Sequence, residues 1–419
     1  MSKKQRIKNQ KMGFNATWSM AVGGMVGGGI FATLGLVIEL AGAYAWLAYL
    51  VGGIAALITG VSYQSLARRF EEGGGVYTFL REVKQKTLAV DMAWLLMVSY
   101  ILTISVYAFT FGHYMEYLLG FGQGIIARIA AAVIIISLTA INLRGVSSAA
   151  WVEIVAVWFK CLILAGLSLI GLWHFNPDVL AYTEVQYAPI FGVGIGAAVV
   201  FMAYEGFQLL AYDYEDINEP KRTLPLAITT AIVFVIVLYI IITLGTAALV
   251  GTEVIVQDKE IALAKAGQAA MGVAGMIIVS LAAVMSTASA INSTLFATAR
   301  LAKHVAEKKD MPAFFAKENK HNVPNHSLVL LGGIALFFAI IGDLGQLVEG
   351  ASLLFLIIFT IVNTIAARHT DHYRTLKWAG AVLCGSLAAC GAYYLAVNHI
   401  WVFAAIIAIA IAVFIRNKK

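Results

Sequence analysis

The chain has 419 residues, of which 61% are hydrophobic and 12% are charged, about half the charged share of an average soluble protein. Its mean hydropathy of +0.84 excludes a water-soluble globular protein, because a core of this size could not bury so much apolar surface. We therefore predict an all-α integral membrane protein, and the net charge of +6 is assigned below to its loops rather than to nucleic-acid binding.

Apolar stretches long enough to cross a bilayer, which takes about 20 residues, recur along the whole chain. No linker separates them into domains, and the longest polar segment, residues 304–325, is too short to fold alone. The sequence predicts twelve membrane spans, with approximate bounds 15–39, 43–66, 88–118, 124–143, 150–174, 187–213, 223–250, 268–303, 326–342, 346–367, 376–397 and 398–416.

The first span contains five glycines between Gly23 and Gly29. Each glycine inside a helix costs about 1 kcal/mol relative to alanine, and lipid provides no water for freed backbone groups. A break of this kind survives where the backbone lines a cavity or binds a ligand, so residues 25–29 are the first candidate for a substrate site at the membrane midplane. Alternatively the glycines serve helix packing, since Gly23 and Gly27 have the small-xxx-small spacing.

In the fifth span, Lys160 lies about ten residues from the start, too deep for easy snorkelling to the interface. An ionisable residue inside a span costs about 2.5–3.5 kcal/mol and is a functional hypothesis by default. Because burial disfavours a charged lysine, Lys160 can release its proton in one conformation, or it can replace a bound sodium ion as a tethered cation. Alternatively it donates permanently to carbonyl groups at a helix end.

The sixth span contains a carboxylate and a glycine, Glu205 and Gly206, inside an apolar run. Interrupted helices five spans apart are typical of an inverted repeat, whose second half enters the membrane from the opposite side. Glu205 can receive a substrate ammonium group or exchange a proton. Alternatively it braces the break as a hydrogen-bonded acid.

In the eighth span, Ser286, Ser289 and Ser293 follow helical spacing and share one face. These hydroxyls can coordinate a cation or bond to a lysine. Equally, they can be ordinary helix-packing residues of a membrane protein.

The basic residues are partitioned between alternate loops, which is the reason for the positive net charge. Most of the 29 lysines and arginines lie in the N-terminal tail, in alternate loops or at the C-terminus; the exceptions are Arg128, Lys160, Lys259 and Lys265. The positive-inside rule then places both termini in the cytoplasm. We divide the chain into a cytoplasmic tail (1–12), a ten-helix transport core (13–367), and two peripheral helices with a short cytoplasmic tail (368–419).

Neither a redox framework nor an enzyme site is indicated. Cys161, Cys384 and Cys390 all fall within apolar spans, which predicts no disulfide and no metal site. The spans contain no His-Glu-x-x-His, Gly-x-Ser-x-Gly or paired-carboxylate arrangement, so we expect no enzyme and no cofactor.

Three motifs together resemble one family over essentially the whole chain. They are the glycine-rich string of residues 27–31, the string Glu-Gly-Gly-Gly-Val-Tyr of residues 72–77, and Tyr-Glu-Gly-Phe of residues 204–207 followed by residues 215–225. The chain is similar to permeases of the amino acid–polyamine–organocation (APC) superfamily. It departs from the usual family pattern at Glu71–Glu72, where a proline is common, and at Glu219, where an asparagine is common.

The resemblance implies a LeuT-type 5+5 inverted-repeat fold with 12 transmembrane helices, in which helices 1 and 6 are broken at the midplane. It implies that the first break donates N–H groups to a substrate carboxylate, while the second accepts from the amino group beside an aromatic gate. Glu205 is added to the implied site because many family members have an apolar or small residue at this position, so a carboxylate there bears on specificity. The expected substrate-binding residues are Val26, Gly27, Gly28, Gly29, Phe201, Ala203, Tyr204, Glu205 and Phe207.

A subgroup, the proton-coupled ApcT-type amino acid transporters, is more similar still. The string Val-x-x-Lys-x-Leu-Ile-Leu at residues 157–164 places Lys160 on the lysine that fills the sodium position in that subgroup. Ser286 and Ser289 fall on its hydroxyls in the eighth span. These three residues are the expected proton-coupling or cation site, with no metal.

The expected function is therefore secondary active transport of an amino acid or related amine across the plasma or inner membrane, coupled to protons and working by alternating access. Its partners would be the small-molecule substrate, protons and membrane lipid, with no nucleic acid. Glu205 motivates one alternative, a carrier or exchanger of polyamines or cationic amino acids. An alternative of another class is a membrane sensor that binds its substrate without transporting it.

Overall fold

The computed structural model describes residues 11–122, 124–145, 150–173, 175–176, 180 and 187–416. Several lysines of the two predicted cytoplasmic tails lie outside these ranges. Within them the chain folds into helices, and its one β-bridge joins Met12 to Ile217. The predicted all-α class is confirmed.

The long helices coincide with the predicted apolar stretches to within a few residues, except around residue 260. They are α2 (Phe14–Met25), α3 (Gly29–Ala41), α4 (Ala45–Phe70), α6 (Lys86–Leu118), α7 (Ile125–Leu143), α8 (Ala150–Trp173), α9 (Pro189–Val199), α10 (Pro220–Gln257), α11 (Ala262–Glu307), α12 (Asn325–Ile341), α13 (Leu344–His369), α14 (Arg374–Asn398) and α15 (Ile400–Arg416).

Two features were not predicted from the sequence. The segment after α4 forms a short helix, α5 (Gly75–Glu82). The helices α10 and α11 extend beyond the predicted bounds of 250 and 268, and each is kinked there, at Gly251 and at Met271–Gly272. Polar residues at these positions suggested a loop, but a helix that extends past the hydrocarbon layer can carry them because water surrounds it there.

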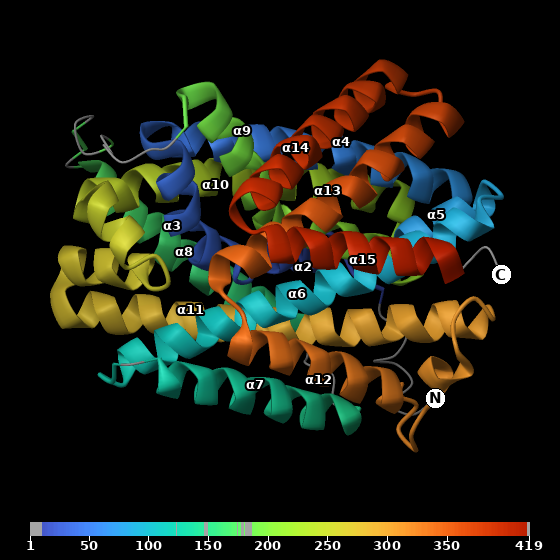
Figure 1. Ribbon diagram of the computed structural model, residues 1–419, viewed down its shortest axis with the longest axis horizontal. Coiled ribbons are helices and arrows are strands. Elements are labelled where there is room, and N and C mark those ends of the chain that lie inside the picture. The colour runs from blue at the N-terminus through green and yellow to red at the C-terminus, as the bar shows by residue number, and fades with distance from the viewer. Residues whose placement is uncertain are drawn as a thin grey trace.

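The broken segments lie inside the bundle (Figure 1). In contact with α2 and α3 are α8, α10 and the 3₁₀ turns η3 (Val200–Tyr204) and η4 (Phe207–Ala211) that follow α9. On one side α7 packs beside α12, and α14 and α15 pack outside α13. This arrangement places both breaks at the centre and the last two helices at the periphery.

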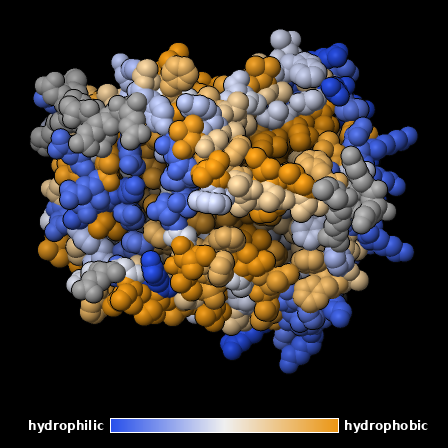
Figure 2. All heavy atoms as spheres, in the orientation of Figure 1, coloured by the Kyte–Doolittle hydropathy of each residue, from blue (hydrophilic) through white to orange (hydrophobic). Residues whose placement is uncertain are grey.

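The surface of the bundle suits a bilayer. In the part of the chain that the structure describes, eight helices are long and apolar enough to cross a membrane, and three further apolar helices are shorter. Figure 2 shows hydrophobic side chains across the middle of one face and hydrophilic ones toward both its left-hand and right-hand ends, the latter beyond α5 and the end of α11. The protein is therefore a multi-pass membrane protein.

Candidate functional site

The glycine-rich run breaks the first helix at the predicted place. The helix α2 ends at Met25, and α3 begins at Gly29, with no side chain capping its N-terminus. The Val26 N–H still bonds to the Val22 carbonyl oxygen at 2.8 Å, the Gly27 N–H bonds to that of Gly24 at 3.2 Å, and Gly28 adopts φ −134° and ψ −9°. Carbonyl groups at the end of α2 and N–H groups at the start of α3 are thereby available to side chains or a ligand.

Three side chains from other helices bond to the carbonyl oxygens released by this break. Lys160 Nζ on α8 donates to Gly23 at 3.1 Å, and Ser286 Oγ on α11 donates to Val26 at 2.7 Å. The third donor is the Tyr239 hydroxyl of α10, 2.7 Å from the Met25 oxygen. The N–H groups of the first turn of α3 have no such side-chain partner.

The second break follows α9 and is shaped by Gly206. After η3 the chain becomes extended at Glu205 (φ −66°, ψ 142°), and Gly206 takes φ 131°, a conformation that other residues rarely adopt. The Gly206 N–H is held by Gln208 Oε1 at 2.9 Å. The sixth span is thus interrupted where the sequence predicted it.

A single hydroxyl connects the two breaks. The Tyr239 oxygen lies 2.7 Å from the Met25 carbonyl oxygen and 2.9 Å from that of Ala203. Both carbonyls therefore converge on one point, which is within hydrogen-bond distance of each. A tyrosine in an apolar run carries no periodic signal, so the sequence did not reveal Tyr239.

The glycines also permit close contact between the broken segments. A Cβ atom on Gly24 would lie 2.8 Å from Gly206 Cα, and one on Gly29 would lie 2.5 Å from Ala203 Cα. A Cβ on Gly28 would lie 2.3 Å from Tyr107 Cδ1 on α6. Packing and backbone exposure are both served by the same glycines, so the two sequence interpretations do not exclude each other.

Glu205 is the one carboxylate within the second break. Its side chain is 2% exposed, and its Oε1 accepts a hydrogen bond from Gln208 Nε2 at 2.9 Å. No ion pair to Glu205 occurs among the described residues, which provide no counter-charge within salt-bridge distance. The buried Tyr107 hydroxyl of α6 is a second polar group close to the Glu205 carboxylate.

The residues of the expected cation site are only partly brought together. Lys160 is 6% exposed, and Ser286 is also buried; both bond to the first break. Ser289 is exposed in this conformation. Its backbone carbonyl oxygen accepts a hydrogen bond from the Ser293 hydroxyl. Lys160 donates to a carbonyl at a helix end here, as the alternative interpretation of the sequence stated.

Aromatic rings form one wall beside the second break. Phe201 and Phe207 both pack against Phe359 of α13, with ring centroids 5.5 and 5.7 Å apart. Phe207 also meets Tyr63 of α4 edge-on at 6.0 Å, and the Tyr204 hydroxyl donates to the Tyr49 carbonyl oxygen at 2.7 Å. The sequence identified the rings of the sixth span but not their partners on α4 and α13.

A cavity of about 390 Å³ lies between η4, α11 and the segment that precedes α5. Its lining combines Met20 of α2, Leu209 and Tyr212 with charged groups of both signs. Arg300 and His304 are the basic groups, and Arg300 Nη1 lies 3.6 Å from Asp213 Oδ1. The carboxylates predominate: they are Glu72, Glu153, Asp213, Glu215 and Asp216. We call this cavity the acidic vestibule.

The helix α5 is anchored beside the vestibule by a polar cluster. The Tyr77 hydroxyl donates to Asp310 Oδ2 at 2.6 Å, and Arg81 forms an ion pair with the same oxygen. Burial, together with the hydrogen bond to Asp310, raises the pKa of Tyr77 to about 12. The phenol therefore stays protonated at physiological pH and keeps its bond.

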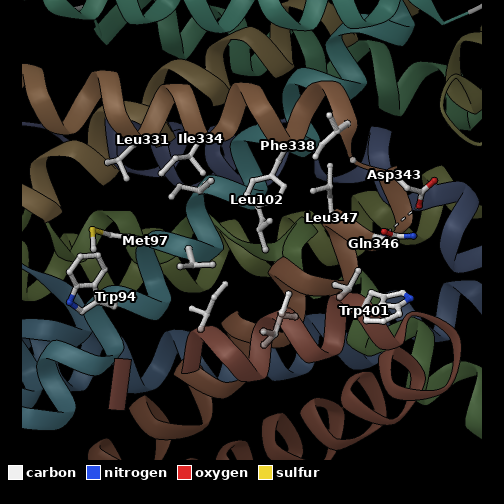
Figure 3. Close-up of a pocket in the computed structure, with 18 of the residues that line it drawn as sticks. Trp94, Met97, Leu102, Leu331, Ile334, Phe338, Asp343, Gln346, Leu347 and Trp401 are labelled. Atoms are coloured by element: carbon white, nitrogen blue, oxygen red, sulfur yellow. Dashed lines mark hydrogen bonds between the residues drawn. The ribbon is translucent and has the colours of Figure 1, made fainter. Parts of the chain in front are cut away.

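A second cavity, of about 480 Å³, has a different character (Figure 3). It lies between α6, α12, α13 and α15, and its polar lining is confined to Asp343 and Gln346 at one end. The labelled apolar side chains that surround it are Trp94, Met97, Leu102, Leu331, Ile334, Phe338, Leu347 and Trp401. It does not involve the broken helices, so we do not assign the transport site to it. Nor do the described residues form a group of three or more His, Cys, Asp or Glu able to hold a metal ion.

Comparison with known proteins gives the family. The sequence profile of the family "Amino acid permease" matches residues 12–416. The chain is 28% identical to the inner membrane transport protein YbaT of Escherichia coli (strain K12) over 86% of this chain and 84% of that protein. It is 26% identical to the serine/threonine exchanger SteT of Bacillus subtilis (strain 168) over 75% of this chain and 72% of that protein. It is 27% identical to the methylthioribose transporter of the same organism over 86% of this chain and 81% of that protein. This protein therefore belongs to the amino acid permease family within the APC superfamily, and it is a membrane transporter rather than an enzyme.

Proposed function

We propose that the protein is a secondary active transporter that moves an amino acid or related amine across the cytoplasmic membrane by alternating access. The observation that carries this proposal is the convergence of the two helix breaks. The Met25 and Ala203 carbonyl oxygens point to one place, while the uncapped N–H groups of α3 begin at Gly29, four residues after Met25. An amine bonds to carbonyl oxygens and a carboxylate bonds to N–H groups at a helix N-terminus, so a zwitterion matches both.

The proposed topology is a LeuT-type 5+5 inverted repeat of 12 membrane spans with both termini in the cytoplasm. The pairing of broken segments five spans apart supports it, as does the peripheral position of α14 and α15. On this proposal residues 13–367 form the transport core and residues 368–419 the peripheral part. The breaks would then lie at the bilayer midplane.

The proposed substrate site follows the same geometry. Backbone N–H groups of Val26, Gly27, Gly28 and Gly29 would hold the carboxylate, those of Val26 and Gly27 after giving up their present bonds to the Val22 and Gly24 carbonyl oxygens. The backbone of Phe201, Ala203 and Tyr204 would face the amine. Phe207 would form part of the wall with Phe359. All of these residues are buried in this conformation, so substrate entry requires the helices to separate.

We further propose coupling to protons through Lys160, with Ser286 and Ser289 of α11 as the other expected residues of this site; Ser286 bonds to the same break in this conformation and Ser289 does not. Lys160 is buried and bonds to the α2 carbonyl of Gly23. Losing its proton removes a charge-assisted hydrogen bond to α2. Protonation is thereby linked to the position of the first broken helix, which is the helix that binds the substrate.

A cationic substrate is the second candidate, because two observations favour positive charge. Glu205 is a buried carboxylate without a described counter-charge, and the acidic vestibule contains more carboxylates than basic groups. An acidic channel concentrates cations. Similar proteins include the serine/threonine exchanger and a cationic amino acid transporter of Arabidopsis thaliana, which is 24% identical over 82% of this chain and 59% of that protein. Their names show that neutral and cationic substrates both occur among similar proteins.

Uptake into liposomes would test the proposal. Purified protein would be reconstituted, and labelled serine, alanine, arginine and putrescine would be offered separately, with protein-free liposomes as the control. Saturable uptake of at least one of these is expected, and arginine or putrescine uptake would favour the second candidate. Saturable binding with no uptake of any ligand would contradict transport and favour a sensor.

A further inference from the structure

A basic pocket lies outside the transport pathway, at the end of α4. Its volume is about 480 Å³, and α4 forms one wall while the turn between α13 and α14 forms the other. The residues that line it are Val61, Gln64, Ser65, Arg68, Arg69, Thr370, Asp371, His372 and Tyr373. Segments more than 300 residues apart in the sequence therefore build one polar concavity.

The lining of the pocket has more basic than acidic groups. Arg68 and Arg69 are exposed, and neither forms an ion pair among the described residues. The same holds for Arg368 and Arg374, which flank the turn. The lining contains one carboxylate, Asp371. An arginine presents five N–H donors in a planar fork that matches a phosphate group.

The exposed surface of α4 changes from apolar to basic toward this pocket. Ile54, Leu57, Val61, Ser65 and Arg68 follow one another at intervals of three or four residues, so they lie on one face of the helix. Each of them is at least partly exposed, and Ile54 is 40% exposed. The strip therefore has bulky apolar side chains at Ile54, Leu57 and Val61 and a charged side chain at its last residue, Arg68.

Neighbouring helices leave this strip open on its outer side. On one flank, a Cβ atom on Gly60 would lie 2.8 Å from Ile232 of α10; on the other, a Cβ on Gly380 of α14 would lie 2.5 Å from Ile58. The strip is thus flanked by α10 and α14, and we call it the furrow. Tyr373, 71% exposed, stands at its basic end, as aromatic residues do at membrane interfaces.

We propose that this furrow and pocket bind an anionic phospholipid, with the phosphate at Arg68 and Arg69 and an acyl chain along Val61, Leu57 and Ile54. The apolar strip distinguishes a lipid from a free phosphate ion, which would use the arginines alone. The excess of arginine distinguishes an anionic headgroup from a zwitterionic one. The lipid would join α14, a helix outside the proposed core, to α4 inside it.

Titration of detergent-purified protein with dioleoyl-phosphatidylglycerol, read by native mass spectrometry, would test this. The double variant Arg68→Gln/Arg69→Gln should bind the lipid at least about tenfold more weakly, because each basic residue contributes separately to anionic-lipid attraction. The matched control Lys317→Gln/Lys320→Gln removes the same charge from exposed residues of another loop at the same end, and it should bind as the unmodified protein does. Equal binding by both double variants would overturn the proposal.

Two further arms separate the lipid from other ligands. Val61→Phe should weaken lipid binding severalfold, because the larger side chain fills the furrow while both arginines stay in place. Arg68→Lys/Arg69→Lys keeps the positive charge, so the folded variant should retain most of the lipid affinity. Inorganic phosphate should compete poorly. Full displacement by phosphate with no effect of Val61→Phe would show a free-anion site, and equal affinity for dioleoyl-phosphatidylcholine would show unspecific lipid contact; either result would refute the proposal.

Discussion

The substitution Glu205→Gln gives the sharpest test of substrate charge. It preserves the shape of the side chain, and the amide oxygen can still accept from Gln208 Nε2, the 2.9 Å bond present now. The substitution removes the negative charge that the carboxylate would present to a substrate cation. The carboxylate is 2% exposed and has no ion-pair partner among the described residues, so a substrate cation would be its counter-charge.

The expected magnitude follows from this burial. A salt bridge at an exposed site contributes about 0–1 kcal/mol, whereas leaving one member of a buried pair alone costs about 3–5 kcal/mol. The amide oxygen of glutamine recovers part of that loss by accepting a hydrogen bond. We therefore expect arginine and putrescine to bind at least about tenfold more weakly, which corresponds to 1.4 kcal/mol. Alanine, which brings no second ammonium group, should change less.

Competition binding to purified protein would measure both ligand classes on the same preparations. Glu349→Gln is the matched control. Glu349 of α13 is also buried, but its Oε2 lies 3.6 Å from Nε2 of His399, which follows α14, and not beside the break. It should leave both affinities nearly unchanged. An equal loss for arginine and alanine in Glu205→Gln would refute charge selection and leave Glu205 the role of bracing the break or carrying a proton.

Two further predictions concern the breaks themselves. Gly28→Val should abolish substrate binding in folded, monodisperse protein. Tyr107→Ala removes the ring that lies 2.3 Å from a Cβ atom at position 28. If Gly28→Ala loses substrate binding and the double variant Gly28→Ala/Tyr107→Ala regains it, the glycine serves packing alone. Tyr239→Phe should lower the melting temperature, because the buried Met25 and Ala203 carbonyl oxygens lose the one hydroxyl hydrogen that they share, at about 1–3 kcal/mol. Substrate should then raise the melting temperature more in Tyr239→Phe than in the unmodified protein, since its ammonium group fills the vacated position; an equal shift would argue against an amine at this point.

The sequence predicted the helices well because long apolar runs have few other folds in a membrane. It also located both breaks, since five closely spaced glycines and the pair Glu205–Gly206 conflict with a continuous apolar helix. In contrast, α5 and the extended ends of α10 and α11 were missed. Their residues are polar enough to resemble loops, and helix formation beyond the hydrocarbon layer leaves no hydropathy signal.

Side-chain partners across the bundle could not be predicted from one sequence. Tyr107, Tyr239 and Phe359 are aromatic residues in apolar runs, where they resemble ordinary core residues. Their roles arise from helix packing, which places the Tyr239 hydroxyl between two breaks that lie far apart in the chain. Ser289 shows the opposite case: helical spacing grouped it with Ser286, yet the packing around α11 buries Ser286 and leaves Ser289 exposed.

Accumulation of labelled substrate in sodium-free proteoliposomes with an imposed inward proton gradient tests the central claim most directly. We predict accumulation above the external concentration, its collapse when a protonophore is added, and its loss in Lys160→Ala, which should still exchange substrate by counterflow. Strict dependence of the unmodified protein on sodium, or accumulation that ignores the proton gradient, would contradict the account.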